Sequence, residues 1–209
     1  MSEFPARDFF HDGMRELQER FDGRRTADAI EKHRKHYDFW EDEREWIETA
    51  QFFFVASSWG EYTDCNIRSG DPGFVKIVAP GVLEYPEYDG NSMYRTLGNI
   101  AKNPNIGLLF VRFDGKSRRI RINGKASIHD DPETLARHFG AKLVVRVVCE
   151  IYPNCPRYIP DLSEGVASPH VPREKHDLPP PPEWKTRDYI RDILPSSDPH
   201  RDLVRTKRP

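Results

Sequence analysis

The chain has 209 residues, with 32 Lys and Arg against 34 Asp and Glu, which gives a formal net charge of −2. This balance provides no attractive field for nucleic acid, and no apolar run approaches the roughly 18 residues that a membrane-spanning helix needs. The N-terminus "MSEFPARDFF" has no signal-peptide pattern. We therefore expect a soluble, cytoplasmic protein that folds as one compact domain with extra arms, or at most as two small domains.

The first half of the chain changes from a helical period to a strand period. Residues 1–25 are charged without a clear period. Residues 26–49 predict one helix with a single apolar stripe, formed by Ile30, Tyr37, Trp40 and Ile47. Four strand patterns follow as consecutive hairpins, separated by glycine and proline turns, at residues 51–58, 62–69, 74–79 and 82–86.

A second helix interrupts the strands. It starts near Asn91 or Ser92 and is stopped by Asn103-Pro104, after which residues 106–113 form a continuous apolar strand. Further along the chain, we predict a long strand at 117–129, a short helix at 132–139 and a strand at 142–152.

The long strand contains Asn123-Gly124, a dipeptide that is typical of a two-residue hairpin turn. However, one alternating phase continues through that dipeptide in Ile120, Ile122, Gly124, Ala126 and Ile128. A turn would free the register, whereas a single strand keeps it. We therefore predict one long strand, with the small residues at positions where something packs closely.

The C-terminal part is rich in proline, because twelve of the eighteen prolines lie from Pro153 onward. Such a segment cannot form the interior of a sheet, so we predict an extended arm in which "EWKTRDYIRDIL" docks as a helix. Sequential antiparallel strands with few crossover helices indicate a small closed barrel rather than a doubly wound sheet. The predicted parts are a helical arm at 1–50, a barrel at 51–152, and an arm at 153–209 that packs on the barrel or on a partner subunit.

Arg95 is unusual because it lies in the first turn of a predicted helix, where the helix dipole favours Asp or Glu. An anion bound at this helix start would attract the backbone N–H groups, Arg95 and the Thr96 hydroxyl together. A phosphate fits best, because it accepts several donors and pairs with the forked end of an arginine. The alternative is an arginine that bends back to solvent or to Asp89.

The remaining charged and sulfur-containing residues suggest no catalytic set. His33 and His36 have helical spacing, but the surrounding Lys and Arg would repel a metal ion, and the three cysteines do not match a zinc pattern. We therefore expect no metal site. A nucleic-acid-binding barrel, with aromatic rings stacking beside arginines, is opposed by the acidic balance, although it would use Arg118, Arg119, Arg121, Phe110 and Phe113. An enzyme without its own nucleophile or metal commonly uses an organic cofactor.

Three segments, "GDPGFVKI", "LEYPEYDGNSMYRTLGNIAKNPNIGLLF" and "RIRINGKASI", resemble the pyridoxamine 5′-phosphate oxidase-like, FMN-binding split-barrel family. The resemblance covers roughly residues 50–152. It implies a mainly β fold, a split antiparallel β-barrel with peripheral helices, and a homodimer with FMN at the subunit interface. The oxidase's C-terminal residues that grip pyridoxal phosphate have no match, so the resemblance is to a branch distinct from the vitamin B6 oxidase itself.

The same resemblance implies which residues contact FMN. The phosphate would be held by Lys76, Arg95, Thr96 and Arg119, with Arg119 reaching across from the partner subunit. The ring and the ribityl chain would lie beside Arg68, Ser69, Asp71, Tyr85, Pro86 and Asn91. Thr96 replaces a Lys of the family pattern, and Arg119, where the oxidase has a Gln, could restore that charge.

The function implied is that of an FMN-dependent oxidoreductase, in which the flavin N5 exchanges hydride with NAD(P)H or an unidentified small-molecule substrate. One alternative is a non-catalytic flavin- or haem-binding module for storage or sensing. Another is a deazaflavin-dependent reductase, because the same barrel hosts that cofactor in related families.

Overall fold

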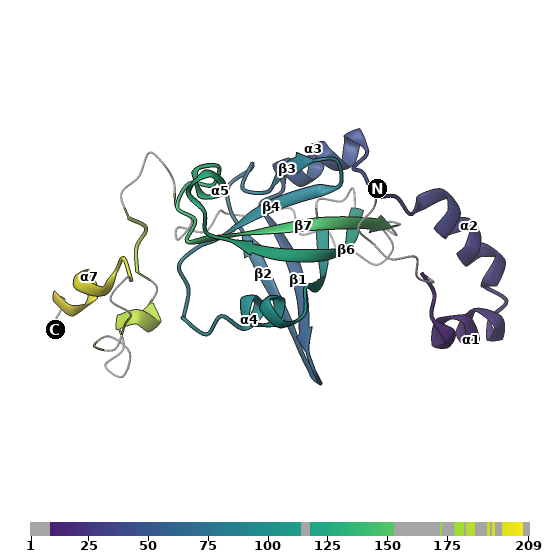
Figure 1. Cartoon of the computed structure of the whole chain (residues 1–209), viewed down its shortest axis with the longest axis horizontal. Helices are drawn as coiled ribbons and strands as arrows, with labels where there is room; N and C mark the ends of the chain where they lie inside the picture. The colour runs from purple at the N-terminus through teal and green to yellow at the C-terminus, as the bar shows by residue number, and fades with distance from the viewer. Residues whose placement is uncertain are drawn as a thin grey trace.

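The computed structural model describes residues 9–113, 118–152, 172, 178–181, 183–186, 192, 194 and 198–206. Its central feature is a seven-stranded antiparallel sheet in the order β2-β1-β5-β6-β7-β4-β3 (Figure 1). The strands are β1 (Phe52–Trp59), β2 (Tyr62–Ser69), β3 (Lys76–Ala79), β4 (Val82–Glu87), β5 (Asn105–Arg112), β6 (Arg118–His129) and β7 (Leu143–Tyr152).

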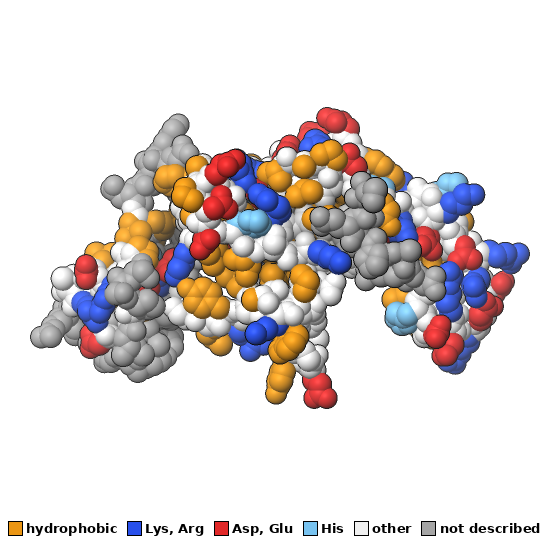
Figure 2. All heavy atoms as spheres, in the orientation of Figure 1, with side chains coloured by type: hydrophobic (Ala, Val, Ile, Leu, Met, Phe, Trp, Pro, Cys, Tyr) orange, Lys and Arg blue, Asp and Glu red, His pale blue; other side chains and the backbone are white. Residues whose placement is uncertain are grey.

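Short helices lie around this sheet. They are α1 (Asp12–Arg20), α2 (Arg24–Arg34), α3 (Glu41–Thr49), α4 (Arg95–Lys102), α5 (Pro132–Ala136), the 3-10 turn η1 (Glu183–Thr186) and α7 (Arg201–Thr206). The α1–α2 pair and α7 lie beyond opposite ends of the sheet (Figure 1). Neither α1 nor α2 contains a buried residue, and Figure 2 shows acidic and basic side chains alternating over them. Within the described residues, no helix combines the length and the apolar character needed to cross a membrane.

The early strands form two hairpins that end up at opposite edges of the sheet. β1 pairs with β2 and β3 pairs with β4, but the described ladders include no β2–β3 pairing. The prediction of consecutive hairpins is therefore wrong at this connection, because the chain after β2 turns toward α3: the Gly73 N–H donates to the Glu48 carbonyl at 2.6 Å. The antiparallel sheet with peripheral helices confirms the predicted split-barrel fold class. The closed barrel expected from the strand pattern is wrong, because β2 and β3 lie at opposite edges of the sheet and no described ladder joins them.

Aromatic residues from three strands form the centre of the core. The ring of Phe53 in β1 lies 5.0 Å from that of Phe110 in β5 and 4.9 Å from that of Tyr85 in β4, measured between centroids. Leu97 and Ile100 of α4 are buried in the same cluster. Burying each such side chain contributes roughly 1.5–3 kcal/mol, so the start of α4 is held firmly beside the sheet.

The single helix expected at residues 26–49 is wrong, because the chain breaks between α2 and α3. His36 pairs with Ile151 as a β-bridge, with an N–H···O distance of 2.9 Å in each direction. The His36 Nε2 atom also lies 2.7 Å from a carboxylate oxygen of Glu43, whose side chain is 1% exposed. Of the predicted stripe, Ile47 is buried, while 38–42% of each of the others is exposed, namely Ile30, Tyr37 and Trp40. The break thus allows His36 to pair with Ile151 near the C-terminal end of β7.

The long strand is confirmed as the continuous β6, which pairs with β5 on one side and β7 on the other. Gly124 lies opposite Cys149, and a Cβ atom at Gly124 would stand 2.2 Å from Cγ1 of Val147. The small residue is therefore required by close packing, as the alternation predicted. The short helix is also confirmed: α5 begins after Asp131, whose carboxylate accepts a hydrogen bond from the Thr134 N–H at 2.9 Å.

Little of the proline-rich arm lies among the described residues. Residues 153–171 fall outside them, and of the predicted docking helix only η1 and the isolated residues 192 and 194 are described. Among the described residues of the arm, five are buried: Lys185, Leu194, Asp198, His200 and Val204. The proposed part boundaries at residues 50 and 152 stay a prediction.

Candidate functional site

A cleft of about 730 Å³ lies where β2, the end of β4, the start of α4 and the C-terminal residues meet. Residues 66–69 of β2 form one side of it, and residues 86–97, which run from β4 into α4, form its floor. The third side comes from Phe139, Gly140 and Lys142 before β7, and the fourth from the C-terminal segment, which we define as the described residues 178–181, 183–186 and 198–206.

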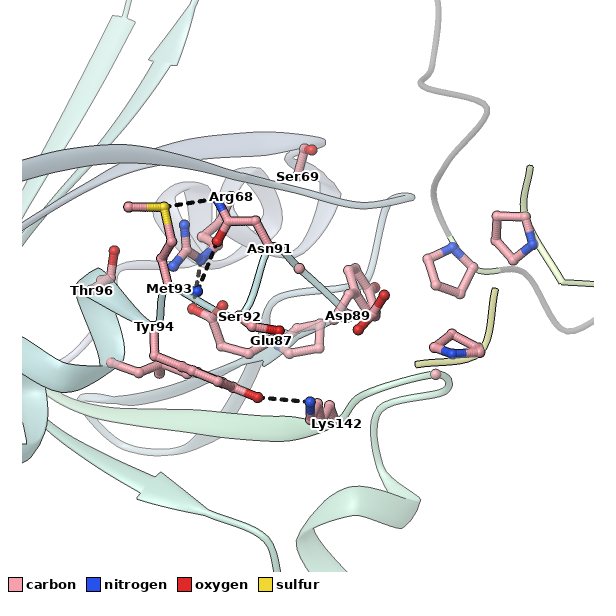
Figure 3. Close-up of a pocket in the computed structure, with 18 of the residues that line it drawn as sticks. Arg68, Ser69, Glu87, Asp89, Asn91, Ser92, Met93, Tyr94, Thr96 and Lys142 are labelled. Carbon is pink, nitrogen blue, oxygen red and sulfur yellow. Dashed lines mark hydrogen bonds and ion pairs between the residues drawn. The ribbon is translucent and has the colours of Figure 1, made fainter. Parts of the chain in front are cut away.

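The loop from β4 to α4 is held in an unusual backbone conformation. Ser92 and Tyr94 have φ angles of 62° and 49°, a left-handed region that non-glycine residues seldom adopt. The Asn91 carboxamide accepts a hydrogen bond from the Met93 N–H at 3.0 Å, which stabilises the turn (Figure 3). The left-handed conformations of Ser92 and Tyr94 interrupt the helix, so α4 begins at Arg95. This start is later than the predicted one near Asn91 or Ser92.

The start of α4 is the most distinctive part of the cleft. Its first turn contains no acidic residue and no side chain caps it, so the first N–H groups keep their capacity to donate. A carboxylate from β2 compensates: Asp64 accepts a hydrogen bond from the Thr96 hydroxyl at 2.8 Å and one from the Arg95 Nε at 3.3 Å. The side chain of Arg95 is nevertheless 57% exposed, against 11% for Asp64. Asp64 therefore fixes the inner nitrogen of Arg95 and leaves its forked end toward the cleft and solvent.

The other cations of the cleft are paired with groups of the chain itself. Arg68 donates from Nε to the Glu87 carboxylate at 2.5 Å, both side chains being mostly buried. Burial raises the pKa of the Glu87 carboxyl above its ordinary value, although Arg68 opposes this shift. The Lys142 ammonium donates to the Tyr94 hydroxyl at 2.7 Å, and this bond raises the pKa of Lys142 (Figure 3). The Arg95 side chain is 57% exposed, against 15% for Arg68 and 2% for Lys185.

The structure brings six of the ten sequence-predicted site residues into this cleft: Arg68, Ser69, Pro86, Asn91, Arg95 and Thr96. It places four elsewhere in the same chain. Tyr85 is fully buried in the core, and Asp71 lies in the turn after β2. Lys76 lies on β3 opposite Glu84, and Arg119 lies on β6 opposite Val111.

Sequence reasoning missed several residues of the cleft. Asp64 contacts Arg95 across 31 positions of sequence, and Lys142 contacts Tyr94 across 48. Lys185 and His200 line the cleft from the C-terminal segment. No local pattern marks these residues, since each is an isolated charge in a charged chain.

A second arginine–carboxylate cluster lies away from the cleft, and we call it the Glu84 cluster (Glu84, Arg137, His138 and Arg146). The Glu84 side chain is 0% exposed and receives hydrogen bonds from Arg137 at 2.9 and 3.0 Å and from Arg146 at 2.7 and 2.8 Å. His138 Nε2 lies 3.3 Å from the same carboxylate. Burial alone would raise the pKa of Glu84, but these donors hold it at about 2. Glu84 is therefore saturated by its own chain.

The sheet order and the peripheral helices define a split-barrel protein. The sequence profile described as "Pyridoxamine 5′-phosphate oxidase" matches residues 39–153, more than half of the chain. The chain therefore belongs to the pyridoxamine 5′-phosphate oxidase-like family. A search of curated protein sequences gave no match.

The matches to solved structures cover most of the length of those structures but only about half of this chain. HupZ of Group A Streptococcus is 20% identical, with a TM-score of 0.43, covering 57% of this chain and 96% of that one. A NimC/NimA family protein of Clostridium acetobutylicum is 13% identical, with a TM-score of 0.40 and coverage of 56% and 87%. A FAD-binding protein of Mesorhizobium loti is 12% identical, with a TM-score of 0.39 and coverage of 57% and 96%. At TM-scores this low, the likenesses carry no argument about function.

Proposed function

We propose that the protein binds FMN in the cleft, with the phosphate at the start of α4, and acts as an FMN-dependent oxidoreductase. Family membership supports a flavin, and the half-exposed Arg95 beside uncapped helix N–H groups is the observation that carries the phosphate assignment. A phosphate gains from both the helix dipole and the forked guanidinium.

The donors at the start of α4 fit a phosphate, with one opposing charge. Arg95 offers the end of its guanidinium, because its single contact with Asp64 uses Nε. The Thr96 hydroxyl donates to Asp64 at 2.8 Å, so a phosphate there would have to take over that donor. Asp64 thus orients Arg95 and at the same time lowers the attraction for an anion. Lys76 and Arg119 remain proposed phosphate contacts that would have to come from outside this chain's cleft.

A second copy of the chain is the proposed source of the missing contacts. β2 lies at an open edge of the sheet, and each of its residues is exposed or half-buried, including Tyr62 at 78% and Ile67 at 49% exposure. Large apolar side chains on an edge strand favour a partner surface. In a homodimer formed there, Arg119 of one subunit would serve the FMN of the other.

FMN supplies hydride exchange at its N5 atom, and the chain supplies binding and orientation. Ser69 and the β2 backbone would run along the flavin ring, while Asn91 and Pro86 would border the ribityl chain. Arg68 is held against Glu87, so we propose that it shapes the wall beside the ring rather than contributing a free positive charge. NAD(P)H or a small molecule would approach from the side that the C-terminal segment borders.

An absorption spectrum of the freshly purified protein tests this function, combined with mass analysis of the released small molecule. We expect the yellow flavin bands, FMN on mass analysis, and bleaching when NADPH is added without oxygen. A colourless protein that takes up no flavin would refute the proposal. Bound flavin that NADPH leaves oxidised would instead favour the non-catalytic module, and release of a deazaflavin would favour the reductase alternative.

A further inference from the structure

The C-terminal segment contains a lysine that is almost entirely removed from water. The Lys185 side chain is 2% exposed, and its ammonium donates to carboxylates of Asp89 and Asp198, the latter at 2.9 Å. Asp89 belongs to the loop after β4, whereas Asp198 belongs to the C-terminal segment itself. A buried ammonium is tolerated only with such partners, so Lys185 ties the segment to the barrel at Asp89.

Two further hydrogen bonds connect Lys185 to residues that line the cleft. The Lys185 ammonium lies 3.2 Å from Nδ1 of His200, and Nε2 of His200 lies 2.7 Å from the Pro179 carbonyl. Because an ammonium and a carbonyl face the two ring nitrogens, Nδ1 accepts from Lys185 and Nε2–H donates to Pro179. Pro179 and His200 both line the cleft. The position of this wall therefore depends on where Lys185 is held.

The same residues do not form a metal site while the lysine is present. Oxygen and nitrogen atoms of Asp89, Asp198 and His200 lie within 4.8 Å of one another, a spacing that could hold a cation. The Lys185 ammonium, however, is within hydrogen-bonding distance of all three groups. The cluster thus carries its own cation, and its role is to join two parts of the chain.

We propose that Lys185 is a positioning residue that fixes the C-terminal segment as one wall of the flavin cleft. The wall restricts the passage of ligands, so it slows the exit of FMN and limits the size of the molecule that reaches the flavin. This inference rests on the proposed function for the identity of the ligand. The docking of the segment on Asp89 does not depend on that identity.

The test uses the full chain loaded with FMN and measures the rate at which FMN leaves. Lys185→Met removes the ammonium of the Lys185–Asp89 ion pair. Asp89→Asn removes the opposite charge of this pair while keeping the shape of the side chain. We expect each variant to release FMN about tenfold faster, with a double variant no faster than the more affected single variant, because both changes remove the same contact. The matched control is Lys102→Met at the exposed end of α4, which should release FMN at the wild-type rate.

Hydrogen exchange without FMN separates this inference from the proposed function. The backbone amides of residues 183–186 and 200–206 should lose protection in Asp89→Asn and keep it in Lys102→Met. Asp89→Asn also covers the case in which Lys185→Met fails to fold, since the Lys185–Asp198 contact remains. Unchanged FMN release and unchanged protection in Asp89→Asn would overturn the inference. If the wild type binds no FMN, the proposed function fails, and retained protection in Asp89→Asn would then overturn the positioning role as well.

Discussion

Two arginine–carboxylate clusters in this protein differ in how completely the chain satisfies them. In the Glu84 cluster, two arginines and a histidine surround a carboxylate that is 0% exposed. In the α4 cluster, which we define as Asp64, Arg95 and Thr96, the carboxylate is 11% exposed but the arginine is 57% exposed. Four short bonds hold the first carboxylate, whereas a single 3.3 Å contact holds the second arginine.

The difference indicates which charges serve the fold and which serve a ligand. The Glu84 carboxylate is buried and already accepts four hydrogen bonds from its own chain, and removing one member of the cluster leaves uncompensated charges. A half-exposed arginine contributes little to stability, because solvent screens its ion pair. Substitutions in the first cluster should therefore change the free energy of unfolding, and substitutions in the second should change the affinity for FMN.

The largest expected effect is the loss of the Glu84 charge. Glu84→Gln leaves Arg137 and Arg146 close together without their common carboxylate, and we expect a loss of about 3 kcal/mol in the free energy of unfolding. Both arginine side chains are about one-third exposed, which keeps the loss at the lower end for a buried pair. Urea unfolding measures it. An unchanged midpoint would show that the cluster does not stabilise the fold.

The pH dependence of stability should show the same cluster. The pKa of Glu84 falls from 4.5 to about 2 on folding, so its contribution is complete above pH 4.5 and is lost as the pH falls toward 2. The loss should reach about 2–3 kcal/mol. Urea unfolding of the wild type and of Glu84→Gln measures this loss of stability between about pH 5 and pH 2, roughly the range in which Glu84 takes up its proton. The variant should show a smaller decrease, and equal decreases would contradict this assignment.

In the α4 cluster, Arg95→Ala should weaken FMN binding by about 2 kcal/mol, or roughly 30-fold, because a charge-assisted hydrogen bond is lost. The free energy of unfolding should change little, since the Arg95 side chain is 57% exposed. Fluorescence titration with FMN measures the affinity. Arg25→Ala on α2 is the matched control, because Arg25 is 87% exposed and lies outside the cleft. An affinity equal to that of the control would remove Arg95 from the site.

A smaller effect of opposite sign is expected at Asp64. Asp64→Asn keeps a side chain of the same shape beside Arg95 and Thr96 but removes the negative charge that repels a phosphate. FMN binding should tighten by about 1 kcal/mol, or roughly fivefold. The same titration measures it, at low and high salt. Weaker binding in the variant would mean that the carboxylate's hold on Arg95 matters more than its repulsion.

Most of the fold could be predicted because its signals are local. Alternating apolar residues and glycine turns gave all seven strands, and one unbroken phase distinguished β6 from a hairpin. The break between α2 and α3 could not be predicted, since it depends on a bridge from His36 to Ile151 at the far end of the sheet. Helical periodicity alone continues across such a break.

The candidate site could be predicted only where its signals are local, as in the fold. Arg95 and Thr96 could be proposed from the sequence because their position at a helix start is a local feature. Their partner Asp64 and the tie between Lys185 and Asp89 depend on contacts across 32 and 96 positions of sequence. Such pairs form only when the strands and the arm are folded together, so no local residue pattern predicts them.

The central claim is that the start of α4 binds a phosphate, and comparing FMN with riboflavin tests it most directly. The two ligands share the ring and the ribityl chain and differ in the phosphate alone. Titration of the wild-type protein should give a dissociation constant for FMN at least tenfold lower than that for riboflavin, as one charge-assisted contact predicts. Equal affinity for the two flavins, or no binding of either, would contradict the account.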